Sequence, residues 1–237
     1  MWNHTHRSGF SDIKPQNILL ETAKINNMFE HAPSTVFRHS SPALAAPDDF
    51  YMESEQVFSA DEDLSTTSVP PGFAVRLADF GTASWVEKHL CEWIQPPSLR
   101  APEVIIGAGW GPSVDIWNLG CVIWELAEGK VLFDGCPTPS APYSAHSHLA
   151  QMQALFGPMP KHLLRRSTNA AKYFDSDGNP LSKSPFPPSS LEGFVDNPEL
   201  IADADKEDFV DLITSMLKLA PEERLDAKDL LNSKWLN

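Results

Sequence analysis

One segment of the sequence, residues 113–129, constrains the fold more than any other. Read as a helix, it begins at Ser113, which can cap it, and ends at Gly129. Apolar residues recur along it at helical spacing. Three large ones continue around its other sides: Trp117, Val122 and Trp124. A helix that is apolar on most of its sides is buried by other elements. The segment therefore predicts a domain built around a central helix.

The other elements in the C-terminal two thirds are also expected to be helices. Residues 205–219 place apolar side chains at i, i+3, i+4, i+7 and i+8, which is the clearest amphipathic pattern in the chain. A shorter helix is expected at 148–156, because Gly157 and Pro158 follow it. A last short helix is expected to begin near Asp226.

A long polar segment separates two short apolar runs near the N-terminus. The runs 18–20 and 75–78 read as the strands of a small β-hairpin. Residues 22–72 are rich in Ser, Thr, Pro and acidic residues and show little periodicity, so we expect a disordered insert there. The expected fold class is α+β, mainly α, with a helical C-terminal part and a small hairpin near its start.

The charge of the chain limits its partners. Its 237 residues include 18 Lys and Arg against 32 Asp and Glu, which gives a formal net charge of -14. Phosphates would be repelled, so the composition argues against direct binding to nucleic acid or to an anionic membrane, and a basic partner fits better. Solubility and an acidic insert explain the same charge equally well. The oligomeric state is left open.

The sequence also predicts where the protein resides. Its most apolar stretch, 116–124, is too short to span a bilayer, and the N-terminus has no apolar run typical of a signal peptide. Three cysteines provide neither a disulfide framework nor paired zinc ligands. We expect a soluble intracellular protein, in the cytoplasm or the nucleus, and the sequence does not favour one of these over the other.

Two short motifs are candidates for carrying chemistry. Asp12 and Asn17 lie five residues apart on a loop that leads into an apolar strand, which suits a base and a metal ligand, and Lys14 would reach the same phosphate-sized space. The second motif is Asp79-Phe80-Gly81, a carboxylate at a strand end followed by a glycine that permits an unusual turn. Each motif alone would more often be a turn or a strand terminus.

Three further motifs follow along the chain, and each alone would also have an ordinary structural explanation. They are Arg100-Ala101-Pro102-Glu103, the D-x-W-x-x-G pattern from Asp115 to Gly120, and Pro221-Glu222-Glu223-Arg224. The order of all five motifs resembles the large lobe of a eukaryotic protein kinase. D-x-K-P-x-N is similar to the catalytic loop of the Ser/Thr kinases.

Finer features resemble one kinase family. Residues 85–89, Trp-Val-Glu-Lys-His, Ile94-Gln95, and the run VDIWNLGCVIWELAEGKVLF at 114–133 look like the serine/arginine-rich-protein-specific kinases (SR protein kinases), especially their fungal members. The resemblance implies a protein-kinase-like fold and an ATP-dependent transferase that phosphorylates Ser or Thr of Arg/Ser-rich proteins. The net charge of -14 suits such basic substrates.

The resemblance assigns roles to residues of the candidate site. Asp12 would be the catalytic base, and Lys14 would neutralise charge on the γ-phosphate of ATP. Asn17 and Asp79 would hold Mg²⁺ at the phosphates. Glu103 and Arg224 would form a buried ion pair, and Asp115 would accept hydrogen bonds from the backbone of the catalytic loop. Leu99 and Arg100 would line the site for the substrate residue after the acceptor (P+1).

The resemblance also predicts the domain organisation. Only 11 residues precede Asp12, with no G-x-G-x-x-G among them, so we expect residues 1–237 to be the C-terminal lobe of a kinase domain without its ATP-binding small lobe. His4-Thr5, which would directly precede the base, is separated from it by six residues. The chain is then a truncated kinase, and a non-catalytic lobe that binds proteins is the alternative.

A third alternative, a calcium site at 175–179, is disfavoured. An EF-hand loop needs Gly at position 6 and Glu at position 12, where this chain has Pro180 and Phe186. A turn is expected there instead. His146 and His148 show no metal spacing, and we expect them to face solvent in a loop.

Overall fold

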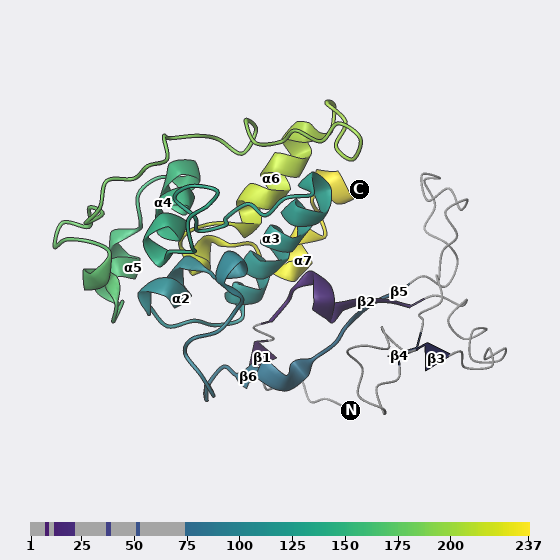
Figure 1. The fold of residues 1–237 in the computed structure, drawn as a ribbon, viewed down its shortest axis with the longest axis horizontal. Coiled ribbons are helices and arrows are strands. Elements are labelled where there is room, and N and C mark those ends of the chain that lie inside the picture. The colour runs from purple at the N-terminus through teal and green to yellow at the C-terminus, as the bar shows by residue number, and fades with distance from the viewer. Residues whose placement is uncertain (1–7, 10–11, 22–36, 39–50, 53–73) are drawn as a thin grey trace. The chain divides into compact units, whose positions relative to one another are not determined.

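The computed structural model describes residues 8–9, 12–21, 37–38, 51–52 and 74–237. The chain divides into two compact units, which are described separately here. The larger unit takes residues 1–17 and 79–237, and the smaller takes residues 18–78. Most of the helices and all of the candidate site residues named above belong to the larger unit (Figure 1).

The described helices of the larger unit follow one another along the C-terminal two thirds of the chain, as the sequence predicts (Figure 1). Short 3₁₀ turns lie before, between and after them, and one that precedes them, at Pro15–Asn17, is part of the candidate site. The α-helices are α2 (Pro102–Ile106), α3 (Ser113–Glu128), α4 (Ala145–Phe156), α5 (Lys161–Arg165), α6 (Lys206–Met216) and α7 (Ala227–Leu230).

Helix α3 is the central helix that its sequence predicts. Trp117 and Trp124 are both fully buried, and their rings pack on Phe133 and Phe209 at centroid distances of 5.8 and 6.0 Å. Helix α6 lies directly against α3 at Gly120, where an added Cβ would come within 2.9 Å of the Leu217 side chain. The glycine therefore allows the two helices to approach closely.

The ends of α3 are only partly as expected. Gly129 ends the helix in the left-handed conformation, at φ 66°, as a C-terminal glycine commonly does. Ser113 does not cap it, because the chain is already helical at Pro112 and Ser113 is the first residue of the helix. The carbonyl of Ser113 instead accepts a hydrogen bond from Arg224 Nη1 at 2.9 Å.

Helix α4 begins three residues earlier than the sequence predicts. The expectation that its two histidines lie in a loop is wrong; His146 is exposed, as predicted, but His148 is not. His146 and His148 lie inside the helix, and His148 is fully buried. The ring of His148 lies 5.6 Å from that of Phe133, and its Nδ1 is 3.1 Å from the hydroxyl of Tyr143. Contacts with these two aromatic residues therefore hold His148 in the interior.

The two remaining predicted helices are present. Helix α6 buries one face through Phe209, Leu212, Ile213 and Met216. Helix α7 begins after Asp226, whose carboxylate accepts the backbone N–H of Asp229 at 2.8 Å and so caps the helix.

The smaller unit contains the predicted hairpin. Strands β2 (Ile18–Glu21) and β5 (Ala74–Leu77) pair antiparallel, with Ile18 opposite Leu77. The predicted disordered insert lies outside the described residues, apart from strands β3 (Phe37–Arg38) and β4 (Tyr51–Met52), which pair with each other.

Two further strands belong to the larger unit. Strand β1 (Ser8–Gly9) pairs antiparallel with β6 (Ser84–Trp85), and β1 falls within the six residues that separate Thr5 from Asp12. None of the helices in the described part of the chain is long and apolar enough to cross a membrane.

Candidate active site

The loop Asp12–Asn17 is folded onto the carboxylate of Asp12. Lys14 Nζ lies 2.8 Å from Asp12 Oδ2. Asn17 Nδ2 donates to the same oxygen and to the backbone carbonyl of Asp12, each at 3.0 Å. The 3₁₀ turn at Pro15–Asn17 brings Asn17 back to Asp12, and both residues are buried. Charge-assisted bonds of this kind fix the orientation of a carboxylate.

The direction of these bonds leaves part of Asp12 available. Both side-chain donors converge on Oδ2, so Oδ1 has no donor among the described residues. A carboxylate held through one oxygen can accept a proton or a hydroxyl hydrogen bond through the other. The loop therefore has the geometry of a positioned general base.

Asp12 lines a cavity of about 310 Å³, whose other walls come from residues 81–95. The walls are mostly apolar, with Leu90, Trp93 and Ile94, and Thr82 adds a hydroxyl. Such a cavity is large enough for one side chain of a bound polypeptide, which would then lie next to Asp12. Trp93 and Leu90 are not predicted by the sequence, since neither belongs to a recognisable motif.

Asp79 has an unusual backbone conformation for a residue other than glycine. Its φ and ψ are 59° and 70°, in the left-handed region that Asp and Asn tolerate better than most residues. Its Oδ1 accepts the backbone N–H of Gly81 at 3.3 Å, and a Cβ at Gly81 would lie 3.2 Å from that oxygen. The Asp79 carboxylate is exposed, while Gly81 lines the same cavity as Asp12.

Gln95 connects the segment after the cavity to helix α3. It also has a left-handed backbone, at φ 71°. Its side-chain Nε2 donates to Asn118 Oδ1 at 2.7 Å and to the carbonyl of Val114 at 3.1 Å, and its Oε1 accepts the N–H of Ala101 at 2.8 Å. One buried amide thus joins three groups, two on α3 and one at Ala101.

The two predicted P+1 residues, Leu99 and Arg100, lie in the interior of this segment. Arg100 donates to the carbonyls of Ile94 and Gln95 at 3.0 and 2.7 Å, and its guanidinium lies 4.1 Å from the ring centroid of Trp93. Burial lowers the pKa of Arg100 from its usual value. Trp93 is 52% exposed, so it is the solvent-facing member of the pair. The P+1 role of Leu99 and Arg100 stays a prediction.

Glu103 and Arg224 form a bidentate ion pair with no exposed side-chain surface. Both oxygen–nitrogen distances are 2.7 Å. Arg224 also donates to the carbonyls of Lys218 and Ser113, and its guanidinium lies 5.0 Å from the ring centroid of Trp117. The pair joins α2 to α3 and to the turn before α7, although its members are 121 residues apart.

Asp115 lies in the first turn of α3 and is half-buried. Its predicted role as an acceptor for the catalytic loop stays a prediction. The predicted turn at 175–179 is present: Asp175 Oδ1 accepts the N–H groups of Asp177 and Asn179 at 2.9 and 2.8 Å. Within the described ranges, no three His, Cys, Asp or Glu side chains are grouped so that they alone hold a metal ion.

Comparisons with known proteins agree with this geometry. Residues 58–236 match the family model of the protein kinase domain. The chain is 41% identical over 160 residues to a serine/threonine protein kinase of Aspergillus fumigatus. The aligned region covers 68% of this chain and 39% of that protein. It is 35% identical over 165 residues to the serine/threonine-protein kinase SKY1 of Saccharomyces cerevisiae, covering 68% of this chain and 22% of SKY1.

A more distant relative matches nearly the whole chain. The human dual specificity protein kinase CLK1 is 26% identical over 244 residues, covering 99% of this chain and 41% of CLK1. The chain therefore spans about two fifths or less of the length of the relatives it matches.

Proposed function

The chain belongs to the protein kinase domain family, and from this premise we propose that it carries the acceptor site of a serine/threonine kinase that uses Mg·ATP and acts on Arg/Ser-rich proteins. The observation that carries the proposal is the carboxylate of Asp12, fixed by Lys14 and Asn17 at the wall of a cavity. The predicted resemblance to Ser/Thr kinases of the SR-protein-specific type is confirmed by the relatives.

Asp12 would orient the hydroxyl of the substrate and accept its proton. A serine side chain entering the cavity would donate its hydroxyl hydrogen to Asp12 Oδ1, the oxygen that Lys14 and Asn17 leave available. The hydroxyl oxygen would then attack the γ-phosphorus of ATP, the bond from that phosphorus to the oxygen it shares with the β-phosphate would break, and ADP would leave. The proton of the hydroxyl would move to the carboxylate. Lys14, which is bonded to Asp12 here, would also compensate negative charge on the transferred phosphoryl group.

The residues present fit a divalent cation that is shared with a nucleotide. Asn17 uses its amide nitrogen for Asp12, so its Oδ1 is available as a ligand, and Asp79 offers an exposed carboxylate. These are the hard oxygen ligands that Mg²⁺ prefers, and two of them are typical where phosphates complete the coordination. The metal would neutralise phosphate charge during transfer.

The segment between Asp79 and Glu103 is held by its own side chains. Gln95 hydrogen-bonds to α3, and Arg100 hydrogen-bonds to the backbone of the segment itself. At its end, Glu103 pairs with Arg224. We infer that this segment keeps the substrate side of the cavity in place without a phosphorylated residue. The net charge of -14 would favour the approach of basic substrates.

The proposal is tested by calorimetric titration of the purified chain with Mg·ATP, followed by transfer of labelled phosphate to an Arg-Ser peptide. We expect Asp79→Ala to abolish binding and Asp12→Asn to keep binding while reducing transfer by about 10²–10⁴-fold. Asp203→Ala, which removes an exposed carboxylate, serves as the control. A folded chain that binds Mg·ATP but transfers phosphate equally well in Asp12→Asn would contradict the role of Asp12. A folded chain that binds no nucleotide would support the non-catalytic alternative.

A further inference from the structure

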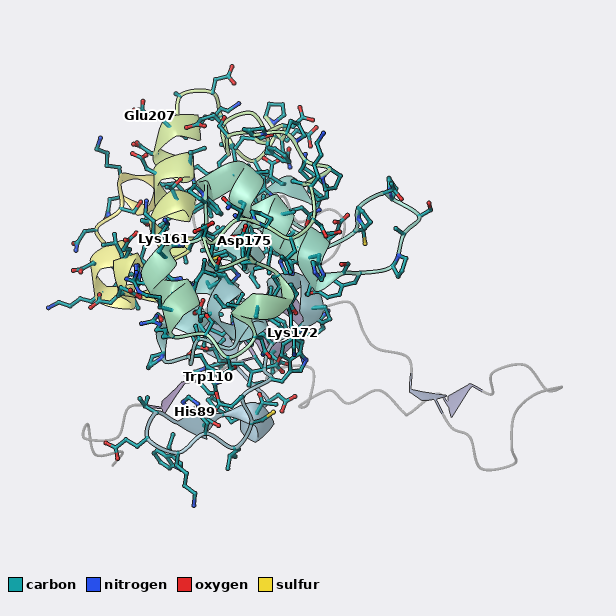
Figure 2. The ribbon with its side chains drawn as sticks, turned by 90° about the vertical axis from the view of Figure 1, so that its left-hand side faces the viewer. His89, Trp110, Lys161, Lys172, Asp175 and Glu207 are labelled. Carbon is teal, nitrogen blue, oxygen red and sulfur yellow. The ribbon has the colours of Figure 1, made fainter. Side chains whose placement is uncertain are left out.

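Residues 161–183 depart from the acidic character of the chain. They contain five of its 18 lysines and arginines but only two of its 32 acidic residues, Asp175 and Asp177. Figure 2 looks onto this face, where Lys161, Lys172 and Asp175 are labelled between Glu207 towards one end and His89 towards the other. A local cationic surface on a protein of net charge -14 is a candidate site for an acidic partner.

Among the described residues, nearby carboxylates pair with only one of these five cations, Arg166. Glu222 is occupied by His162 and Arg166, at 2.6 and 3.2 Å. Asp175 accepts hydrogen bonds within its own turn, and the bonds from Asn179 lower the pKa of its carboxyl group. Four exposed cations have no carboxylate partner within the described ranges: Lys161, Arg165, Lys172 and Lys183.

A groove lies beside these cations. It has a volume of about 320 Å³ and runs between α4 and residues 173–185. His146 and Gln153 line it from α4, and Tyr173 and Lys183 line it from the opposite side. None of its lining residues is acidic, so its charge is that of Lys183.

The groove is held open by contacts between its two walls. His146 Nε2 is 3.1 Å from the carbonyl of Lys172, and its ring lies 4.8 Å from that of Tyr173. The N–H of Ser189 donates to the carbonyl of Ala154 at 2.8 Å. A groove with such fixed walls requires little reorganisation to bind a ligand.

Helix α5 adds its cations at the turn that precedes Lys183. A Cβ on Gly178 would lie 3.0 Å from Leu164, so the turn at 175–179 packs on α5. Lys161 and Arg165 stand on that helix, one on each side of Leu164 in sequence. The cations of α5 and those of the groove wall therefore belong to one surface.

We propose that this groove and its flanking cations dock an acidic, extended peptide segment of a partner protein. Carboxylates of the segment would pair with Lys183, Lys172 and the cations of α5, and Gln153 would hydrogen-bond to the peptide backbone. A peptide fits better than a nucleic acid, because the groove is short and the surrounding acidic surface would repel a long polyanion. The site is distinct from Asp12 and does not require phosphoryl transfer.

The proposal is tested by fluorescence anisotropy with the full chain at low salt, in the absence of nucleotide. The probes are a labelled peptide of alternating glutamate and alanine, the same peptide with glutamine for glutamate, and a short single-stranded RNA. We expect the acidic peptide to bind about tenfold or more tightly than the glutamine peptide, and its affinity to fall as salt is added.

Charge reversal distinguishes this groove from general attraction. The double variant Lys172→Glu/Lys183→Glu should weaken binding by about tenfold or more, whereas Lys228→Glu/Lys234→Glu, with the same change in charge, should weaken it less than about twofold. Equal weakening by both variants, equal binding of the glutamine peptide, no binding of the acidic peptide, or tighter binding of RNA would each overturn the proposal. Since no nucleotide is present, these outcomes are independent of the kinase assay.

Discussion

Two ion pairs of nearly equal length illustrate how differently the two units of the chain use charge. Glu103 and Arg224 lie 2.7 Å apart in the larger unit, with no exposed side-chain surface. Glu21 and Arg76 lie 2.6 Å apart across the hairpin of the smaller unit, with more than half of each side chain exposed. The distances alone would predict similar energies, and burial makes them differ.

Breaking the buried pair is strongly destabilising because one charge then remains unpaired in the interior. Removing one partner leaves the other as an unpaired charge in a protein interior, which costs about 3–5 kcal/mol. Breaking an exposed pair returns both charges to water and costs about 0.2–1 kcal/mol. The burial of each pair therefore sets the size of the effects predicted below.

The largest effect is expected for Glu103→Ala. Arg224 would lose both of its 2.7 Å contacts and keep only its bonds to backbone carbonyls. We expect a loss of about 3–5 kcal/mol in the free energy of unfolding, measured by urea denaturation and near-UV circular dichroism. Glu222→Gln, which alters an exposed pair, is the control and should cost less than about 1 kcal/mol.

A double variant sharpens the same comparison. Replacing both partners by apolar residues, as in Glu103→Leu/Arg224→Met, leaves no unpaired charge in the interior. It should therefore be less destabilising than Glu103→Ala alone. If the double variant is the more destabilised of the two, the energy resides in the geometry of the pair, and the explanation from the unpaired charge is wrong.

The second prediction concerns His148, a buried histidine whose neutral form is favoured in the folded protein. Burial, reinforced by the positive charge of Arg100, lowers its pKa to about 3 from 6.5. Its Nε2 is buried without a partner among the described residues, so a proton there would find no acceptor. Between these two pKa values the unfolded chain binds a proton that the folded chain does not.

The sign of the effect follows from that difference. The contribution of neutral, buried His148 to the free energy of unfolding is fully retained above pH 6.5 and is lost as the pH falls towards 3. The free energy of unfolding should fall by about 1.4 kcal/mol per pH unit over this window. Urea denaturation at several pH values measures this slope. His148→Gln should reduce it, and an unaltered slope in this variant would refute the assignment.

The sequence predicted those elements whose signal is local. Helices α3 and α6 and the β2–β5 hairpin follow from the spacing of apolar residues. The start of α4 was missed because its first turn is polar, and His148 is buried only through contacts with Phe133 and Tyr143. Helices α2 and α5 have five residues each, too few to show a period.

The same distinction applies to the candidate site. The spacing of Asp12, Lys14 and Asn17 placed them on one loop, and the structure brings the side-chain nitrogens of Lys14 and Asn17 within 3.0 Å of the Asp12 carboxylate. Pairing residue 103 with residue 224 required the family resemblance, since no local pattern joins positions so far apart. Gln95 was noted only as part of the family resemblance, and no local pattern indicates its contacts: its left-handed backbone has no glycine to mark it, and its partners on α3 are set by tertiary packing.

The smallest effect is expected at the exposed pair of the hairpin. Arg76 and Glu21 lie diagonally across the paired strands, since Arg76 is opposite Leu19 and Glu21 is opposite Ala74, and both remain largely hydrated. Glu21→Gln should therefore change the protection of the hairpin amides against hydrogen exchange by less than about 1 kcal/mol, and added salt should reduce the change further. Thr, a β-branched residue, at the same position would test strand propensity separately. The hairpin pair has no desolvated partner to leave unpaired, so its loss should cost little. If Glu21→Gln lowered the stability as much as Glu103→Ala, burial would not be what distinguishes the two pairs.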